Sequence, residues 1–470
     1  MPHRFFSFVM ILAGTGAMLL AGGCTVGPKY TQPVVPVPQS WRIPVSESAD
    51  LANENWWDLF KDPVLQQMIQ IALVHNTDIE TAAAQVMQAQ AQVAVTRSNE
   101  FPQVSATPSI ARERLAANGS FVLPPGESQT FNLAELPGSV SYLADFWGEY
   151  RRATQEARED LLATEQARQN VIIGVVSSVA QDYFQLRALD LQLTETHATV
   201  KAYQASLNLT EILFKGGVES ELDTKQAQIA LDTALAEIPS LEEQIGHEED
   251  ALSILLGVNP STMPRGLSVL VQPLPPAVPA GLPSALLERR PDVLEAAHDL
   301  AAEFAAVGVA KAQFFPQLSL TADGGVESSV LSKIISVPAL MWSAAAGITA
   351  PIFTGGRLTG NLHIAEAQQQ QALINYQSTV LEAFREVDDA LISYKRSREQ
   401  VTAQQALVNA EGGALRLANV RYKAGVDTYL NVLTAEQALF SGQITLAQDR
   451  ASVLIALVQL YQALGGGWQP

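Results

Sequence analysis

The sequence has almost none of the residues on which thiol or metal chemistry depends. Among its 470 residues it has one cysteine, Cys24, so disulfides within the chain and thiolate metal clusters are excluded. The six histidines are scattered, with no HExxH or other ligand spacing. Phosphate-binding loops, nucleophile elbows and dinucleotide-binding glycine fingerprints are also missing. Without a nucleophile, base and metal in combination, the chain is predicted not to be an enzyme and to need no cofactor.

Positive charge and long apolar runs are scarce as well. Lys and Arg total 29 against 48 Asp and Glu, which gives a formal net charge of −19. This balance argues against a nucleic-acid partner, because phosphates require a basic footprint. No central run of 18 apolar residues occurs, which argues against a transporter with several membrane helices.

The first 24 residues have the pattern of an export signal. Arg4 supplies positive charge, residues 5–20 are apolar, and small residues precede Cys24. Residues 1–23 are therefore predicted to be a signal peptide. The small residues before Cys24 resemble a bacterial lipobox, although Ala21 stands where leucine is usual. The resemblance implies a covalent lipid on Cys24, and Thr25 after it favours the outer membrane. Simple secretion with a free thiol at Cys24 remains the alternative.

Proline marks the segments that separate larger regions. Residues 24–62 are proline-rich at their start and predicted to lie extended along a surface. Seven prolines between Pro260 and Pro283 predict a linker over 261–283. The linker separates two regions, 63–260 and 284–470.

These two regions are internal repeats of each other. The sequence Phe101-Pro102-Gln103 recurs 214 residues later as Phe315-Pro316-Gln317. Phe214-Lys215-Gly216-Gly217-Val218 recurs 208 residues later as Tyr422-Lys423-Ala424-Gly425-Val426. Because both the order and the spacing are kept, the two halves are predicted to share one structural plan.

Each half is predicted to contain a short helical stretch, a strand region and then very long helices. The short stretches are expected over about 63–99 and 284–313. No proline occurs over 138–238 or 352–469, so helices of roughly 65 residues, about 100 Å long, are expected before the turns at Gly217 and Gly425. Apolar residues step by four and three along the second of these regions, the spacing of a coiled-coil seam. They are Val380, Phe384, Val387, Leu391 and Tyr394.

Four strands of about ten residues are expected from alternating apolar and polar residues. They lie at 103–109, around 140–146, and at 317–323 and 342–349, and their length suits tilted strands that cross a bilayer. Soluble hairpins with one buried face would show the same alternation. If the strands span a membrane, several chains must complete one barrel, because open strand edges are prohibitive in lipid.

Several motifs together resemble the TolC-type outer-membrane factors, specifically the lipoprotein NodT/OprM branch of RND-type tripartite efflux systems. The resemblance covers essentially the whole mature chain. It implies an α+β membrane fold: a homotrimer with a 12-stranded β-barrel, four strands per chain, continuous with a long periplasmic α-helical coiled-coil barrel. It further implies an exit duct for small toxic compounds, with a periplasmic adaptor and an inner-membrane RND-type transporter as partners. The motifs are Cys24 to Tyr30, Trp56 to Phe60, Glu288 to Val293, Phe315 to Leu318 and Arg421 to Leu430.

The resemblance also places a periplasmic gate at the turns of the long helices. Asp223 matches an acidic residue that bonds a tyrosine of the neighbouring turn in this family, and Tyr422 matches that tyrosine. Asn431 and Thr434 stand where TolC has pore-facing aspartates, so a constricting ring would rest on Asp427. Solvated turn acids without a gating role are the alternative. The predicted gate and turn residues are Asp427, Asp223, Tyr422, Glu219, Glu221, Gly216, Gly217 and Gly425.

Two further questions stay open at the level of the sequence. Pro291 and Asp292 suit the first turn of a helix, while Arg289 or Arg290 in an ion pair between subunits is the sharper alternative. For the whole chain, the alternatives to an efflux duct are the outer-membrane duct of a type I protein secretion system and a lipidated periplasmic coiled-coil scaffold without a pore.

Overall fold

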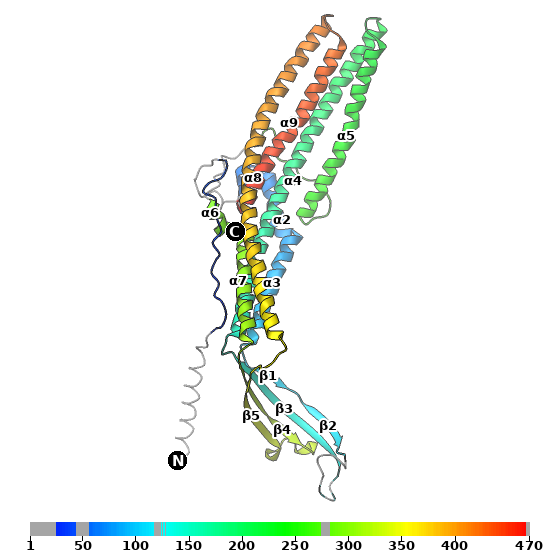
Figure 1. Cartoon of the computed structure of the whole chain (residues 1–470). Helices are drawn as coiled ribbons and strands as arrows, with labels where there is room; N and C mark the ends of the chain where they lie inside the picture. Colours follow the sequence, from blue (N-terminus) through cyan, green and yellow to red (C-terminus); the bar gives the residue numbers. More distant parts are fainter. Residues whose placement is uncertain are drawn as a thin grey trace. The chain divides into compact units, whose positions relative to one another are not determined.

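The computed structural model describes residues 25–43, 56–116, 124, 126, 128–273 and 283–466. The predicted signal peptide, Cys24 and part of the predicted linker lie outside these residues. Figure 1 shows long helices and one sheet. Two compact units share the chain: the first takes 1–33, 87–163 and 296–376, and the second takes the remainder.

The sheet of the first unit is antiparallel and has the order β1-β3-β4-β5, with β2 also paired to β3. Its order means that β3 and β4, one from each half of the sequence, are neighbours. The strands are β1 (Gln103–Ala106), β2 (Ser109–Arg114), β3 (Thr130–Ala144), β4 (Gln317–Ser328) and β5 (Leu340–Thr349).

The prediction of four strands is wrong by one. The first predicted strand, 103–109, is divided into β1 and β2, which pair with successive parts of β3. The break falls at Thr107 and Pro108, because proline has no N–H to donate to the ladder. Because β1 and β2 lie end to end beside β3, the five strands are still four strands wide across the sheet. The other three predicted strands are confirmed, and β3 begins ten residues earlier than expected.

Two strands come unusually close at the centre of this sheet. Gly325 of β4 lies opposite Pro137 of β3. A Cβ at Gly325 would overlap the Leu136 carbonyl oxygen and lie 2.8 Å from the Pro137 Cα. The adjacent Gly324 has no atom within 4 Å of the same position. Of these two adjacent glycines, Gly325 is therefore the one that packing within the chain requires to be glycine.

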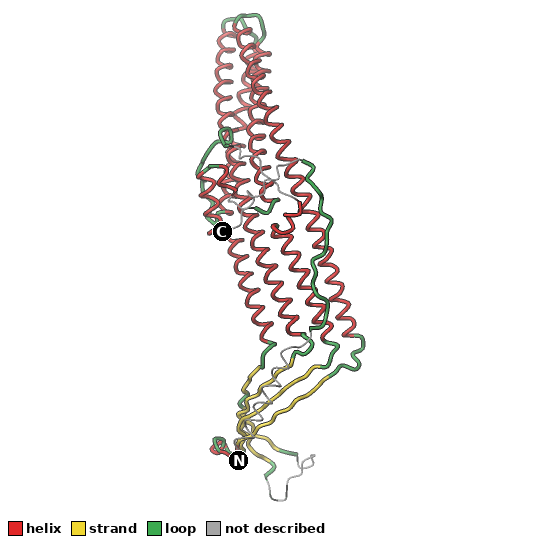
Figure 2. Tube along the Cα trace, turned by 90° about the vertical axis from the view of Figure 1, so that its left-hand side faces the viewer, coloured by secondary structure: helices red, strands yellow, loops and turns green. Residues whose placement is uncertain are grey.

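The long helices match the prediction closely. Helices α4 (Glu149–Lys215) and α8 (Arg357–Lys423) each have 67 residues, and α5 (Glu221–Leu255) and α9 (Tyr429–Ala463) each have 35. Helices α4 and α5 form one helical hairpin, and α8 and α9 form the other. The two hairpins lie side by side in Figures 1 and 2. The sequence repeat thus produces two hairpins of equal length.

The short helical stretches are confirmed, with one break in each. The first contains α2 (Pro63–His75) and α3 (Thr77–Ser98), and the second contains α6 (Pro283–Arg289) and α7 (Pro291–Ala312). Asn76 ends α2, and its Oδ1 accepts the Asp78 and Ile79 N–H groups at 2.9 and 3.1 Å. Because it satisfies the free donors of the next helix, it separates two helices without a proline.

The core of the second unit combines the predicted coiled-coil seam with aromatic packing. All five seam residues, Val380 to Tyr394, are buried. Trp56, in the short helix η2 (Trp56–Phe60), stacks on Tyr461 with ring centroids 5.5 Å apart, and Phe60 contacts Phe184 at 5.0 Å. Burying large aromatic side chains contributes much of the packing energy of such a core. The N-terminal segment therefore fastens onto helices from both halves.

Residues 25–43 form no helix or strand and lie along helices, whereas residues 56–60 of the predicted extended segment 24–62 form the short helix η2. In the first unit, Tyr30 packs edge-on against Phe304 with ring centroids 5.5 Å apart. In the second unit, Trp41 packs against Phe384 at 6.3 Å, and the Arg42 N–H donates to Asp388.

Arg290 forms two ion pairs within the chain. Its side chain is 8% exposed and pairs with Asp292 at 2.6 Å and Glu386 at 2.7 Å, both within the chain. It also donates to the Ala463 carbonyl oxygen at 3.1 Å. These contacts use the Arg290 donors where α6, α7, α8 and α9 meet. An ion pair between subunits through Arg289 or Arg290 stays a prediction. Pro291 begins α7 as expected.

Candidate functional site

The predicted gate lies at two turns that have the same backbone structure. Gly217 and Gly425 adopt φ of 73° and 69°, the left-handed region that favours glycine. After each glycine, a valine N–H donates back to the helix: Val218 to the Leu213 carbonyl at 2.9 Å, and Val426 to the Arg421 carbonyl at 3.0 Å. This is the Schellman arrangement that closes a helix C-terminus. Gly216 directly follows α4 and is exposed.

The first tip presents acids in two different environments. Asp223 forms a capping box with Ser220, whose hydroxyl donates to it at 2.5 Å, and this bond lowers the pKa of Asp223. Partial desolvation and the adjacent Asp223 carboxylate raise the pKa of Glu219. Glu221 lies exposed in the first turn of α5. Among these acids, Asp223 is the one whose carboxylate caps the N-terminus of α5.

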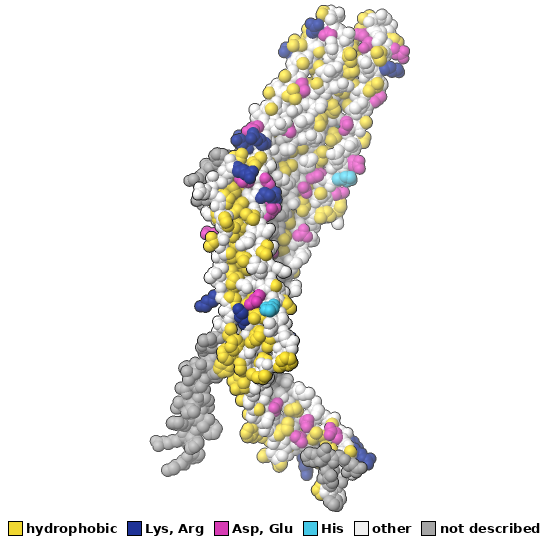
Figure 3. All heavy atoms as spheres, viewed as in Figure 1, with side chains coloured by type: hydrophobic (Ala, Val, Ile, Leu, Met, Phe, Trp, Pro, Cys, Tyr) yellow, Lys and Arg dark blue, Asp and Glu magenta, His cyan; other side chains and the backbone are white. Residues whose placement is uncertain are grey.

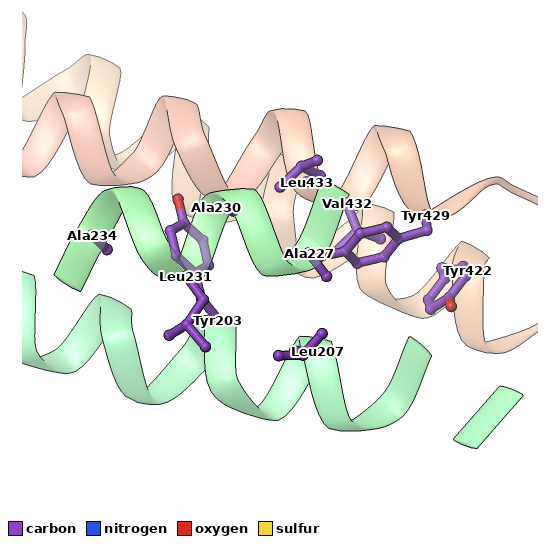
Figure 4. Close-up of a cluster of buried hydrophobic side chains, with 10 residues drawn as sticks. All are labelled: Tyr203, Leu207, Ala227, Ala230, Leu231, Ala234, Tyr422, Tyr429, Val432 and Leu433. Atoms are coloured by element: carbon purple, nitrogen blue, oxygen red, sulfur yellow. The ribbon is translucent and has the colours of Figure 1, made fainter. Parts of the chain in front are cut away.

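Tyr422 is 8% exposed, and its ring packs against Tyr429 with centroids 5.8 Å apart (Figure 4). Burial and the nearby Glu219 carboxylate raise the pKa of its hydroxyl. The Tyr422 hydroxyl does not meet the geometry of a hydrogen bond to the Glu219 carboxylate. The expected hydrogen bond from Tyr422 to Asp223 is not made within the chain, because Asp223 accepts from Ser220 instead. The predicted residues Glu219, Asp223 and Tyr422 nonetheless lie close together.

The second tip holds an ion pair that the sequence did not reveal. Arg421 Nε donates to Asp427 Oδ2 at 2.9 Å, and the Asn431 amide also donates to this carboxylate. The guanidinium lowers the pKa of Asp427. Asp427 is therefore neutralised locally and is not a bare carboxylate. The available signal was a basic residue in the last turn of α8, where it complements the helix dipole.

Glu219 and Asp427 occupy equivalent places in the repeat, each directly after the Gly-Val pair of its turn. Arg421 has no counterpart in the first half, where Leu213 stands. The two tips thus share a backbone but differ in charge. Among the described residues, no group of His, Cys, Asp and Glu is arranged to hold a metal ion.

No helix within the described ranges is both long and apolar enough to cross a membrane.

Comparison with known families decides the class of protein. The family model described as "Outer membrane efflux protein" matches residues 68–258 and 282–466, one stretch in each half. The chain belongs to this family. It is an outer-membrane efflux channel whose helical part extends into the periplasm.

Individual relatives agree over nearly the full length. The chain is 38% identical to the probable efflux pump outer membrane protein TtgC of Pseudomonas putida, covering 98% of this chain and 96% of TtgC. It is 34% identical to the cation efflux system protein CusC of Escherichia coli, covering 100% and 99%. The crystal structure of the Campylobacter jejuni CmeC outer membrane channel superposes with a TM-score of 0.89 at 25% identity, covering 95% and 96%. The predicted TolC-like fold is thereby confirmed, and these relatives are channels rather than enzymes.

Proposed function

We propose that three copies of this chain close one pore in the outer membrane and serve as the exit duct of a tripartite efflux pump. The observation that carries this proposal is the open sheet. Strands β1 and β2 form one edge and β5 the other, and neither edge is paired within the part of the chain that the structure describes. Unpaired backbone groups are too costly in lipid, so the edge of one chain must pair with the opposite edge of the next.

Exposed side chains of the sheet support its placement in a bilayer. On β5, Trp342 is 78% and Ile348 74% exposed, and on β1 Val104 is 76% exposed. Phe353 follows β5 and is 90% exposed. Aromatic residues near both ends of a spanning strand favour the two membrane interfaces. Figure 3 shows apolar side chains exposed on the strand region as well as on the helices.

The hairpin tips support the partner proposal. Each tip carries an exposed valine and leucine at equivalent positions: Val218 and Leu222, then Val426 and Leu430, between 50% and 74% exposed. Exposed apolar groups in a solvated turn favour a protein partner. We assign this surface to a periplasmic adaptor, which joins the duct to an inner-membrane RND-type transporter.

The names of the relatives indicate the broad class of the exported compounds, but not the individual compounds. Relatives are named for efflux of toluene, antibiotics, solvents and cations. A passive duct discriminates little, so we propose small toxic compounds as the class and leave the selection to the pump.

Oligomeric state and conductance test the proposal. Native mass spectrometry of the detergent-purified chain is expected to give a trimer, and planar bilayers are expected to show discrete pores. The purified trimer should also retain a periplasmic adaptor in a pull-down. A stable monomer, or any assembly that forms no pore, would contradict the duct and favour the scaffold without a pore.

Anchoring is proposed through a lipid on Cys24. Replacing Cys24→Ser should abolish acylation and reduce the fraction sorted to the outer membrane, since each buried acyl CH₂ contributes about 0.8 kcal/mol. Insertion of the sheet should leave part of the protein in that membrane. Radiolabelled palmitate measures the change, and incorporation equal to that of the unsubstituted chain would show that Cys24 is not the acylated residue.

A further inference from the structure

The two hairpins are joined side by side through polar pairs between α4 and α9. Gln181 pairs with Gln459 at 3.2 Å and Gln192 with Gln448 at 3.3 Å. Nearer the tips, the Ser206 hydroxyl donates to Glu436 Oε1 at 2.9 Å. We call these three pairs the rungs of the α4–α9 seam. Two rungs consist of amides, which do not titrate, and only the rung nearest the tips contains a carboxyl group.

Glu436 is buried without a compensating charge. Glu436 is 8% exposed, and its Oε2 has no hydrogen-bond partner within the described ranges. Among the described residues, no Lys, Arg or His forms an ion pair with it. Removing a bare carboxylate from water without a partner is costly. The protonated form of Glu436 therefore suits this environment better than the charged form.

The groups facing Glu436 are hydroxyls and apolar side chains. Tyr203 and Ser206 belong to α4, and Tyr429 belongs to α9. The Ser206 hydroxyl donates to Glu436, and both tyrosines interact electrostatically with its carboxylate. Burial raises the pKa of Glu436, and burial together with Glu436 raises that of Tyr203 to about 12. Figure 4 shows the apolar cluster to which Tyr203 and Tyr429 belong. The cluster residues from α5 and α8 are Ala227, Ala230, Leu231, Ala234, Leu415, Ala418 and Tyr422.

We infer that Glu436 makes the α4–α9 seam proton-sensitive: the neutral carboxyl group holds the tip ends of the two hairpins together, and its ionisation releases them. Glu436 is a positioning residue, because it acts on the gate through the packing of the hairpins. It lies seven residues into α9 after Tyr429, about 10 Å along the helix. The inference rests on the proposed duct, in which the tips must part to open the pore.

The direction of the pH effect follows from proton binding. With the seam intact, Glu436 binds its proton more tightly than a solvated carboxyl group, whose pKa is about 4.3. Raising the pH from this value toward the raised pKa therefore favours the parted state, which binds fewer protons. Below this window both states are protonated and the effect vanishes. Within it, each pH unit changes the equilibrium by up to about tenfold per chain.

Single-channel recording of assembled trimers in planar bilayers tests this inference. The open probability of the unsubstituted duct is expected to rise as the pH is raised above about 4.3, the pKa of a solvated carboxyl group, and to level off once Glu436 is ionised in both states. Glu436→Gln replaces the carboxyl with the amide found in the other two rungs, and should give a low, pH-independent open probability. Glu237→Gln removes an exposed acid on α5 and should keep the profile of the unsubstituted duct.

Two outcomes would separate failure of this inference from failure of the duct. Pores whose pH profile is the same with and without Glu436→Gln would overturn the inference and leave the duct intact. Trimers that form no pore with any of the three sequences would overturn the duct itself. If Glu436→Gln impairs assembly, Ser206→Ala provides the second variant. It removes the hydroxyl donor and should shift the profile toward opening at lower pH, and an unchanged profile would also overturn the inference.

Discussion

Replacing Gly325→Ala is expected to prevent most of the chain from assembling into trimers. The new Cβ would overlap the backbone of β3 at Leu136 and Pro137, and backbone atoms cannot rotate away as side chains do. Overpacking of this kind costs roughly 3 kcal/mol, which reduces the correctly paired sheet about 100-fold. Because β3–β4 is the junction between the two halves of the sheet, this loss should appear in the whole assembly.

The adjacent residue provides the control. Gly324→Ala introduces the same methyl group into the same strand, where no atom lies within 4 Å. The yield of trimer in the outer-membrane fraction, measured by native electrophoresis, should fall for Gly325→Ala and stay close to normal for Gly324→Ala. Equal yields of the two variants would mean that the strands separate easily at this point.

Ion selectivity is expected to move in opposite directions when the two partners of the second tip are changed singly. Asp427→Asn leaves Arg421 unpaired, so three extra positive charges surround the pore and favour anions. Arg421→Ala leaves Asp427 bare and favours cations, as charged rings do in channels. For a charge about 10 Å from the axis, each chain contributes about 0.4 kcal/mol in water. Three chains change cation preference about sevenfold at low salt and about twofold at 0.1 M.

Combining the two changes makes this test sharp. The double variant Arg421→Ala with Asp427→Asn has the same net charge as the unsubstituted tip, so its selectivity should return to the original value. Reversal potentials in a salt gradient measure all four channels, and Glu237→Gln, which removes an exposed acid on α5 away from the tips, serves as the control. If neither single change alters selectivity in assembled trimers, the tips do not line the narrowest part of the pore.

The helices could be predicted because the sequence features that indicate them are local and extend over many residues. The absence of proline over 138–238 and 352–469 fixed the hairpins, and the glycines after Phe214 and Tyr422 fixed their turns. The break at Asn76 was missed, because an asparagine that caps a helix resembles any polar residue on a helix surface. The division of the first strand at Pro108 was also missed, although proline is a known interruption of a ladder.

The positions of the two turns could be predicted, but the side-chain partners of the predicted gate residues could not. Arg421 and Asp427 are six residues apart, and only the left-handed turn at Gly425 brings their side chains together. Glu436 could not be recognised at all from the sequence, because its environment is created by Ser206, which is 230 residues away. Long-range contacts of this kind depend on the register between helices, which periodicity alone does not set.

The equal lengths of the paired helices limit how this family can change by insertion and deletion. Helices α4 and α8 agree at 67 residues and α5 and α9 at 35. Adding one residue to α4 would displace its tip by about 1.5 Å and turn it by about 100°, so the first tip would lose its level with the second. An insertion in one half is therefore tolerated only with a matching insertion in the other. The lengths of the helices in the two halves therefore depend on each other.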